Sequence, residues 1–441
     1  MLIIEGFQSA KSVLSRQVLT EFYPTSLTLE LKSKRLPARD EAEREVRKII
    51  DEVRKRGDSA VRAYTSKYDG LKLTSLEVSK EHIASAHRGV NAELVSALRL
   101  AAERIRSFHS VQKDKIWGDI SRQGSGQLIR PLERIGLYVP GGAVPYPSTV
   151  LMTAIPAKVA GVNEVIMVTP PKANGAVPPS ILVAADIAGV DRILSVGGAQ
   201  AIAALAFGTE SVPKVDKICG PGNIFVTLAK RLVYGVVDID GLQGPSEVLI
   251  IADETADPRY CAADLLAQAE HDPLASAILI TTSRQLADKI NREVEQQLQE
   301  LQCRAIATES LVAKGKIAVV ADVDEAIELA NLYAPEHLCL MVKEPNSHIN
   351  KVSNAGCIVI GGKATVVLGD YVAGPSHVLP TGGTARFSSP LSVNDFTKLI
   401  NWISIDGVDL KQLSRAAAII ARAEGLKAHA IAVEKRLESD S

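Results

Sequence analysis

Hydrophobic positions recur along this chain with two different spacings. Between residues 38 and 114 the apolar residues come every three or four positions in a highly charged background, as in EAEREVRKIIDEVRKRG and AELVSALRLAAERIRSFHSVQ. This spacing predicts amphipathic helices with solvated charged faces. From Leu132 onward, short apolar runs alternate with helix-like segments. That alternation predicts βαβ units in a parallel sheet.

Two such series of strands follow one another. The first contains the predicted strands LERIGLYV, EVIMVTP, RILSVGG and VDKIC, and the second contains VLIIAD, SAILITT, IAVV and HLCLMV. Because the two series have the same texture, we predict an α/β fold with a duplicated, doubly wound architecture. The tail from Ser392 differs, since DFTKLINWI and LSRAAAIIARAEGLKAHAIAVEKRLE are both predicted to be helical.

Composition narrows the class of protein. With 441 residues, of which 46% are hydrophobic and 23% charged, the chain is typical of a globular protein with two or more domains. A net charge of −1 argues against nucleic acid or an acidic membrane as the main partner, because both select basic surfaces. There is no apolar run of about 18 residues and no secretory signal pattern, so we expect a cytoplasmic protein. Five widely spaced cysteines disfavour a disulfide framework or a thiolate zinc site.

Three glycine-containing loops each lie between a predicted strand and a predicted helix. They are PGG at Pro140–Gly142, VGGAQ at Val196–Gln200 and GPGN at Gly220–Asn223. Neither the G-x-G-x-x-G fingerprint nor a Walker A motif is present. One such loop alone is more often a simple turn, but three at the same end of one sheet favour a ligand crevice. A helix N-terminus with glycine clearance can receive a phosphate, which makes NAD a candidate ligand.

A candidate metal site begins at a helix after Asp257. Asp257 can cap this helix and Pro258 suits its first position, while Pro273 predicts that the helix ends near His271. Gln268 and His271 then share one face of the last turn, and imidazole is a good zinc ligand. A polar helix end with a histidine is also common without any metal, and from this pair alone that structural interpretation is favoured.

Further candidate ligands come from the C-terminal part of the chain. Asp370 and His377 lie in the Gly- and Pro-rich segment LGDYVAGPSHVLPTGG. Glu424 and His429 are five residues apart in AEGLKAHA, so they address one site only if a helix begins or bends between them, which Gly425 permits. A plain surface helix is the alternative.

Two adjacent side chains that could act as general bases precede the apolar run LCLMV. Glu336 and His337 are adjacent at the predicted start of that strand, in YAPEHL, and could supply two bases of different affinity. An isolated Glu–His pair at such a position is more often structural. Aldehyde oxidation commonly uses a thiolate nucleophile, but no cysteine lies in an activating context. A carboxylate that activates water could serve instead.

Together these motifs resemble the histidinol dehydrogenase family. The resemblance covers nearly the whole chain, and so many long motifs in the same order exclude coincidence. The matching segments are RIGLYVPGG, YPSTVLMTAIPAKVAGV, VGGAQAIAALAFGT, GPGN, GPSEVLIIAD, LLAQAEHDP, YAPEHL, GDYVAGPSHVLPTGGTARFSSPLS and EGLKAHA.

The resemblance implies the chemistry and the residues that perform it. It implies oxidation of L-histidinol through L-histidinal to L-histidine, the last steps of histidine biosynthesis, with NAD as co-substrate and one zinc ion per subunit. The implied bases are Glu336 and His337, and the implied zinc ligands are Gln268, His271, Asp370 and His429. The implied substrate contacts are Ser246, Gln268, His271, His337, Asp370, Glu424 and His429, and the implied NAD contacts are Tyr138, Gln200 and Asn223. His377 is expected to support the ligands rather than to bind.

The resemblance also implies a domain organisation. We expect two Rossmann-like doubly wound domains without the usual fingerprint, small helical elements at both ends, and a homodimer whose C-terminal tail reaches the partner's active site. The expected parts are an N-terminal segment (1–37), a helical part of the second α/β domain (38–131), an NAD-binding domain (132–245), a second domain with the metal and base residues (246–384) and the tail (385–441).

Two other functions use the same residue types. A zinc hydrolase could activate water with the Glu–His pair and no redox cofactor, and a non-catalytic protein could bind an amino acid or nucleotide on the same scaffold. The intact pair of Glu336 and His337 argues against the second alternative. Formation of NADH from histidinol would separate the dehydrogenase from both.

Overall fold

We describe the chain from a computed structural model. It comprises two compact units, one built from Met1–Lys113 with Leu132–Phe396 and one from Asp114–Pro131 with Thr397–Ser441. None of the helices in the described part of the chain combines the length and the apolar character that a membrane span requires. The described residues are 1–16, 39–116, 120–122, 124–141, 145–405 and 407–438.

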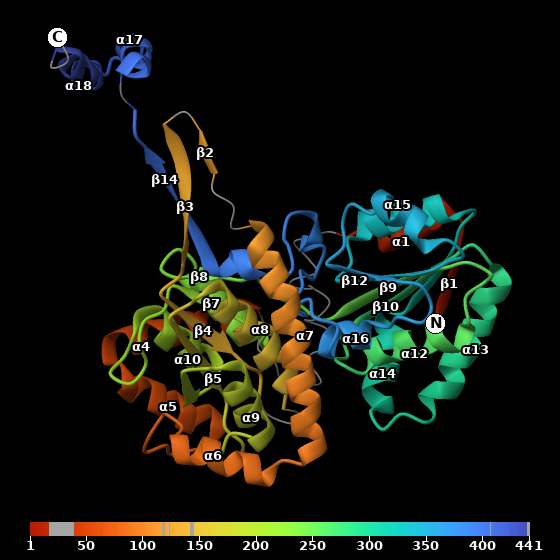
Figure 1. The fold of residues 1–441 in the computed structure, drawn as a ribbon. Helices are drawn as coiled ribbons and strands as arrows, with labels where there is room; N and C mark the ends of the chain where they lie inside the picture. The colour runs from red at the N-terminus through yellow and green to blue at the C-terminus, as the bar shows by residue number, and fades with distance from the viewer. Residues whose placement is uncertain (17–38, 117–119, 123, 142–144, 406, 439–441) are drawn as a thin grey trace. The chain divides into compact units, whose positions relative to one another are not determined.

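The first unit contains a five-stranded parallel sheet with the order β6-β5-β4-β7-β8 (Figure 1). Numbered along the chain this order is 3-2-1-4-5, which is the order of a doubly wound sheet. The strands are β4 (Arg134–Tyr138), β5 (Glu164–Thr169), β6 (Arg192–Ser195), β7 (Lys217–Cys219) and β8 (Asp238–Ile239). The connecting helices are α8 (Pro147–Ala160), α9 (Pro179–Ala188), α10 (Gly198–Phe207) and α11 (Ile224–Val233).

Side chains that alternate along each strand build a core on either face of this sheet. In β5, Val165 and Met167 pack with α8 and α9, whereas Ile166 and Val168 pack on the opposite face with α10 and α11. Strands buried on both faces are continuously apolar, as EVIMVT is. The predicted parallel α/β architecture is therefore confirmed for this segment.

The helices that precede the first sheet also belong to it. Apolar residues of α4 and α5, such as Val46 and Val61, join the core on one face, and α6 and α7 contribute Ala86 and Ile105 to the other. The expectation that 38–131 forms part of the second α/β domain is therefore wrong. The helices are α4 (Arg39–Arg56), α5 (Asp58–Asp69), α6 (Lys80–Gly89) and α7 (Ala92–Ile116).

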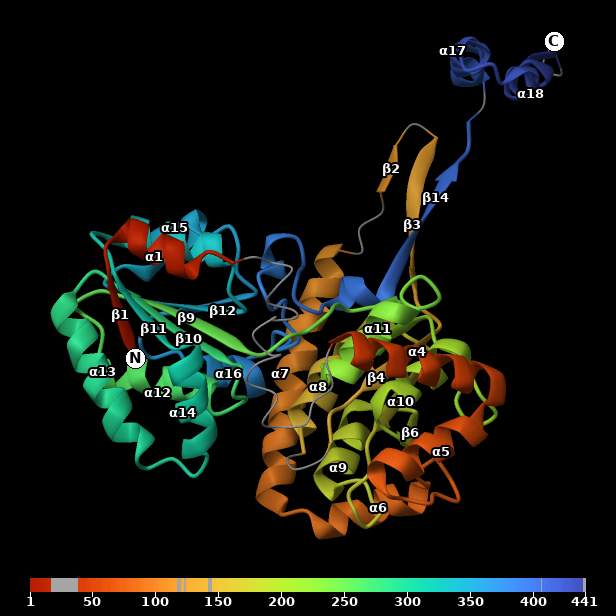
Figure 2. The ribbon, with the colours of Figure 1, turned by 180° about the vertical axis from the view of Figure 1, so that it is seen from behind.

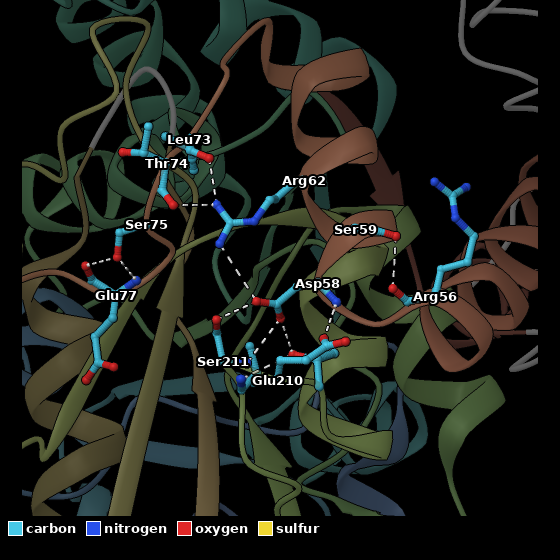
Figure 3. A network of polar contacts seen from close by, with 12 residues as sticks. Arg56, Asp58, Ser59, Arg62, Leu73, Thr74, Ser75, Glu77, Glu210 and Ser211 are labelled. Carbon is cyan, nitrogen blue, oxygen red and sulfur yellow. Dashed lines mark hydrogen bonds and ion pairs between the residues drawn. The ribbon is translucent and has the colours of Figure 1, made fainter.

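A polar network fixes the start of α5 (Figure 3). The carboxylate of Asp58 accepts hydrogen bonds from the Thr209 hydroxyl at 2.6 Å, the Ser211 amide at 3.2 Å and the Ser211 hydroxyl. Burial raises the pKa of Asp58, but these bonds outweigh it and hold the pKa below its usual value. Arg62, which also faces Asp58, donates to the main-chain oxygens of Leu73 at 2.6 Å and Thr74 at 2.8 Å. The network ties α5 to the turn after α10.

The first unit also contains a six-stranded parallel sheet with the order β1-β11-β10-β9-β12-β13. From β9 to β13 the order along the chain is again 3-2-1-4-5, so the predicted duplication is present. The extra edge strand β1 pairs with β11 and comes from the segment expected to stand apart as 1–37. Residues 17–37 of that segment lie outside the described part. The strands are β1 (Leu2–Glu5), β9 (Glu247–Ala252), β10 (Ser276–Thr281), β11 (Lys316–Val319), β12 (His337–Met341) and β13 (Cys357–Ile360).

Helices cover both faces of this second sheet (Figures 1 and 2). Leu249 and Ile251 of β9 face α1 and α15, while Val248 and Ile250 face α12, α13 and α14. The helices are α1 (Phe7–Leu14), α12 (Pro258–Ala269), α13 (Arg284–Leu298), α14 (Arg304–Ala313), α15 (Val323–Tyr333) and α16 (Val366–Tyr371), with 3₁₀ turns η2 (Pro345–Lys351), η3 (Thr384–Arg386) and η4 (Val393–Phe396).

The second unit is an antiparallel sheet followed by two helices. Its strand β14 (Thr397–Ile403) pairs with β3 (Ser125–Pro131), which pairs with β2 (Ile120–Arg122). The prediction of a helix over DFTKLINWI is therefore wrong, because β3 provides the partner strand for every residue from Thr397 to Ile403. The helices α17 (Gly407–Ala423) and α18 (Lys427–Glu438) are separated at Gly425, which has φ of 78°, so a new helix does begin between Glu424 and His429, as Gly425 permits.

Candidate functional site

The Glu336–His337 pair lies at the amino end of β12, as the sequence predicted. Helix α15 ends at Tyr333, and Ala334 then adopts a left-handed conformation with φ of 53°, which a residue with a Cβ rarely does. Pro335 follows, and His337 is the first residue of the strand. Both side chains are buried, Glu336 with 6% and His337 with 4% of its surface exposed. A strained turn before two buried ionisable groups is typical of a functional site.

The main chain of Glu247 holds both members of this pair. Glu247 is the first residue of β9, and its N–H donates to Oε2 of Glu336 at 2.8 Å. Its carbonyl oxygen lies 3.2 Å from Nδ1 of His337. Because that carbonyl can only accept, it favours a proton on Nδ1 and leaves Nε2 to act on other groups. Nε2 lies 3.3 Å from Oδ1 of Asp370.

The pKa values of Glu336 and His337 are both raised, for different physical reasons. Burial raises the pKa of Glu336 to about 7, although the neighbouring His337 and the Glu247 N–H act against it. Burial lowers the pKa of His337, but the carboxylates of Glu336 and Asp370 outweigh it and raise the pKa to about 9. Two ionisable groups with perturbed pKa values at one buried position are candidates for acid–base chemistry.

Asp370 gathers three histidines around it. It lies near the end of α16, and its main-chain oxygen is 2.9 Å from Nδ1 of His377. Burial raises the pKa of the Asp370 carboxyl, but His337, His377 and His271 together hold the pKa below its usual value. His377 thus contacts the main chain of Asp370, and its role in supporting the ligands stays a prediction.

The end of α12 contributes the two other predicted ligands of this unit. Asp257 caps the helix by accepting from the Arg259 amide, and Pro258 occupies its first turn, as predicted. Gln268, only 3% exposed, lies in the last turn, and its main-chain carbonyl oxygen accepts a hydrogen bond from the main-chain N–H of His271 at 3.3 Å. The helix runs back from the carboxyl end of β9, which brings these residues to the amino edge of the sheet.

Two predicted residues lie in the second unit. Glu424 follows α17 and His429 lies in the first turn of α18, and both side chains are exposed there. In the described part of the chain, no three His, Cys, Asp or Glu side chains are arranged to hold a metal ion. The predicted ligand set takes two such residues, His271 and Asp370, from one unit and His429 from the other. An amide, a carboxylate and two imidazoles are a donor set that suits zinc.

The residues predicted to contact NAD lie at the carboxyl edge of the five-stranded sheet. The Tyr138 hydroxyl accepts from the Gly198 N–H at 3.1 Å, and burial raises the pKa of Tyr138 to about 12. Gln200 follows in the first turn of α10 and is 2% exposed. The Asn223 side chain caps α11 by accepting from the amides of Phe225 and Val226. Asn223 therefore has a structural duty, with only its side-chain N–H₂ left to donate.

Contacts with Tyr138, Lys230 and Asp240 hold Gly220 of the GPGN turn in place. A Cβ at Gly220 would lie 2.1 Å from the Tyr138 carbonyl oxygen, so only glycine fits there. The buried Lys230 donates to the Gly220 oxygen at 3.0 Å and pairs with Asp240, whose carboxylate accepts from the Gly220 N–H at 2.7 Å. This edge is where doubly wound sheets bind ligands. Gly142, in the first of the three loops, lies outside the described residues.

Known proteins share this sequence and fold. A family model described as histidinol dehydrogenase matches residues 32–437. The chain belongs to the histidinol dehydrogenase family. It is 57% identical over 438 residues to a histidinol dehydrogenase of Dehalococcoides mccartyi strain CBDB1, covering 99% of this chain and all of that protein. A histidinol dehydrogenase of Clostridium acetobutylicum is 51% identical over 395 residues, which cover 89% of this chain and 92% of that protein.

A solved structure agrees with these relatives. The crystal structure of histidinol dehydrogenase from Elizabethkingia anophelis has a TM-score of 0.91 and 36% identity, covering 100% of this chain and 98% of that one. Members of the histidinol dehydrogenase family are oxidoreductases, so the predicted enzyme class is confirmed. The hydrolase and binding-protein alternatives have no comparable support.

Four of the five cysteines have thiols whose pKa is raised. Burial raises the pKa of the Cys219 and Cys339 thiols well above their usual value and raises the pKa of Cys261 to about 12. Burial also raises the pKa of Cys357. A thiolate is therefore disfavoured at these four positions.

Two residues of the site were missed by sequence reasoning. Glu247 contacts both members of the base pair, and Arg16 binds the Glu247 carboxylate. A signal for Glu247 existed, because EVLIIA is an otherwise wholly apolar buried strand that begins with an acid. No local pattern indicates Arg16, whose partner is 231 residues away.

The Glu336–His337 pair lies at the amino edge of its sheet, opposite to the edge where doubly wound sheets usually bind ligands.

Proposed function

We propose that this chain is a zinc-dependent enzyme that oxidises L-histidinol through L-histidinal to L-histidine with two molecules of NAD, and so completes histidine biosynthesis. The observation that carries the proposal is the buried Glu336–His337 pair beside Asp370, in a chain of the histidinol dehydrogenase family. The cytoplasmic location expected from the sequence is part of this proposal.

The residues proposed to hold zinc are Gln268, His271, Asp370 and His429. When bound, zinc would fix the imidazole and amino nitrogens of the substrate as a template. His337 lies against Asp370, whose negative charge raises the pKa of the imidazole. A cation bound to Asp370 would offset that charge, and the pKa of His337 would then fall. The neutral imidazole is the form that a base needs.

His337 is proposed as the base of both oxidations. Its Nδ1 is engaged with the Glu247 carbonyl, so Nε2 is the atom that takes the proton. In the first oxidation it takes the hydroxyl proton as the carbinol carbon gives a hydride to NAD. In the second it takes a proton from the aldehyde hydrate as that carbon gives a hydride to a second NAD. Each step thus removes one proton and one hydride.

Glu336 is proposed to activate the water that forms the hydrate. Its carboxylate takes a proton from water as the oxygen attacks the aldehyde carbon. A pKa of about 7 leaves a substantial fraction of Glu336 ionised near neutral pH, and makes it a stronger base than an ordinary carboxylate. Burial of the pair excludes bulk water from competing reactions.

The remaining predicted residues complete the proposal. Ser246 precedes β9, and it would contact the substrate together with Glu424 and the zinc ligands. Tyr138, Gln200 and Asn223 would contact NAD at the edge of the other sheet. In a homodimer, Glu424 and His429 would come from the partner's C-terminal tail.

The proposal is tested by the absorbance of NADH at 340 nm. Purified enzyme is incubated with a limiting amount of L-histidinol and excess NAD, with and without prior treatment with a chelator. Two NADH per histidinol are expected, because the alcohol-to-acid conversion removes four electrons. Activity should disappear after chelation and return with added zinc. Absence of NADH in the zinc-loaded protein would overturn the proposal, and one NADH per histidinol would overturn the second oxidation.

A further inference from the structure

Glu247 connects the proposed bases, Glu336 and His337, to Arg16. Its main-chain N–H and carbonyl oxygen contact Glu336 and His337 respectively, at 2.8 Å and 3.2 Å. The orientation of both bases therefore depends on where the first residue of β9 lies. The side chain of Glu247 points elsewhere, and that side chain is itself buried.

The Glu247 carboxylate is held by a two-pronged ion pair with Arg16. Nη1 of Arg16 donates to Oε1 at 2.9 Å and Nη2 donates to Oε2 at 2.9 Å, and the two side chains are only 2% and 8% exposed. The N–H of Gly382 donates to Oε1 at 3.2 Å. The same guanidinium lies over the ring of Tyr333, 3.3 Å from its centroid. Tyr333 is the last residue of α15, three residues before Glu336.

Arg16 thus contacts both segments that carry the base pair. It fixes the start of β9 through Glu247 and the end of α15 through Tyr333. A planar guanidinium can bind a carboxylate with two parallel bonds and stack on a ring at the same time, which an ammonium group cannot do. Loss of Arg16 would leave a buried carboxylate without its cation, next to Glu336, whose pKa the charge of Glu247 already raises.

We propose that Arg16 is a positioning residue for the Glu336–His337 pair and acts through Glu247. The proposal rests on the proposed function for the roles of Glu336 and His337. Arg16 reaches the two bases through Glu247 and Tyr333, so its effect is on their orientation and charge. It also lies outside residues 32–437, the part of the chain matched by the family model.

The test compares four variants in the oxidation of supplied histidinal. Arg16→Met should lower kcat at least about tenfold, as expected for loss of acid–base function, with the KM for NAD nearly unchanged. Arg16→Lys should recover part of kcat. Arg16→Met combined with Glu247→Gln should recover more, because the side chain at position 247 is then neutral and the main-chain contacts to Glu336 and His337 are kept. Arg284→Met, which removes an exposed partner of Glu5, is the matched control and should leave kcat unchanged.

A spectroscopic measurement separates this proposal from the proposed function. The ¹⁵N signals of the His337 ring, assigned by their absence in His337→Ala, should move in Arg16→Met and return towards the wild-type position in the double variant. Unmoved His337 signals would overturn the positioning role, whether or not histidinol is the substrate. A kcat equally low in Arg16→Met and in the double variant, with both folded by circular dichroism, would also overturn it. Wild-type enzyme inactive on histidinol, with His337 signals that move, would overturn only the proposed function.

Discussion

At the scale of the residue, the pKa values of two adjacent ionisable groups are both raised, for different physical reasons. Burial favours the neutral form of Glu336, with a pKa of about 7, whereas two carboxylates favour the charged form of His337. A base is most effective when its pKa lies close to the pH at which it works. The chain meets this condition at Glu336 by burial. The neighbouring carboxylates raise the pKa of His337 to about 9, and a cation on Asp370 would lower it again.

The raised pKa of Glu336 predicts a pH dependence. Protonated Glu336 cannot activate water, so the oxidation of supplied histidinal should slow as the pH falls below about 7. Stopped-flow measurement of NADH across this range checks the prediction. Since the folded pKa exceeds the ordinary value of 4.5, the stability contributed by Glu336 is present below that value and is lost as the pH rises through about 7. Glu336→Gln should therefore gain stability relative to wild type as the pH rises, and a constant difference would contradict the pKa.

Substitution of the two bases should separate the two oxidations. Glu336→Gln should slow oxidation of histidinal by roughly 10²- to 10⁴-fold and affect oxidation of histidinol much less, because only the second step needs activated water. His337→Ala should slow both by a similar factor. Single-turnover measurements with each substrate check this. A normal rate of histidinal oxidation by Glu336→Gln would show that Glu336 does not activate water.

The sequence predicted those functional residues whose signal lies in their immediate neighbours along the chain. Glu336 and His337 are adjacent, and Asp257 caps its helix in the way its neighbours predict. The pairing of Asp370 with His337 depends on two segments 33 residues apart and is visible only in the fold. Arg16 is more distant still, and its importance arises from the low exposure of the ion pair.

At the scale of the element, α12 and the turn that follows it bring the proposed ligands Gln268 and His271 to the amino edge of the second sheet. His271→Ala should lose bound zinc and turnover together, since one imidazole donor of four is removed. Metal analysis of the purified variant beside the 340 nm assay checks this. His348→Ala, which alters a histidine on the η2 turn, is the matched control and should keep both. Full zinc content and a normal rate in His271→Ala would exclude this residue as a ligand.

Prediction of the elements succeeded where the apolar period was unambiguous. The strands of both parallel sheets are apolar on both faces, and the glycine loops mark the turns that follow them. The strand β14 was missed because its pairing with β3 joins residues far apart in the chain. The helices α4 to α7 were assigned to the wrong sheet because an amphipathic pattern indicates a buried face but not the surface that buries it.

At the scale of the whole molecule, the second unit has an unusual number of exposed apolar side chains. Leu399, Ile403, Ile419 and Ile420 are 58%, 76%, 68% and 59% exposed in the single chain. Large apolar side chains left exposed on one unit are consistent with a surface that another chain covers. The same unit holds Glu424 and His429, so a dimer in which it docks on a partner would share its active sites.

Complementation between two inactive variants tests this sharing. His337→Ala and His429→Ala should each be nearly inactive alone. In a mixed dimer with shared sites, one site combines both defects, while the other combines an intact body with an intact tail and should work. Refolding equal amounts together makes about half of the dimers mixed, so roughly a quarter of all sites should be active. If each site lay within one chain, both sites of the mixed dimer would stay inactive. Size-exclusion chromatography must show dimers, and dimers with no activity above that of the separate variants would refute the shared site.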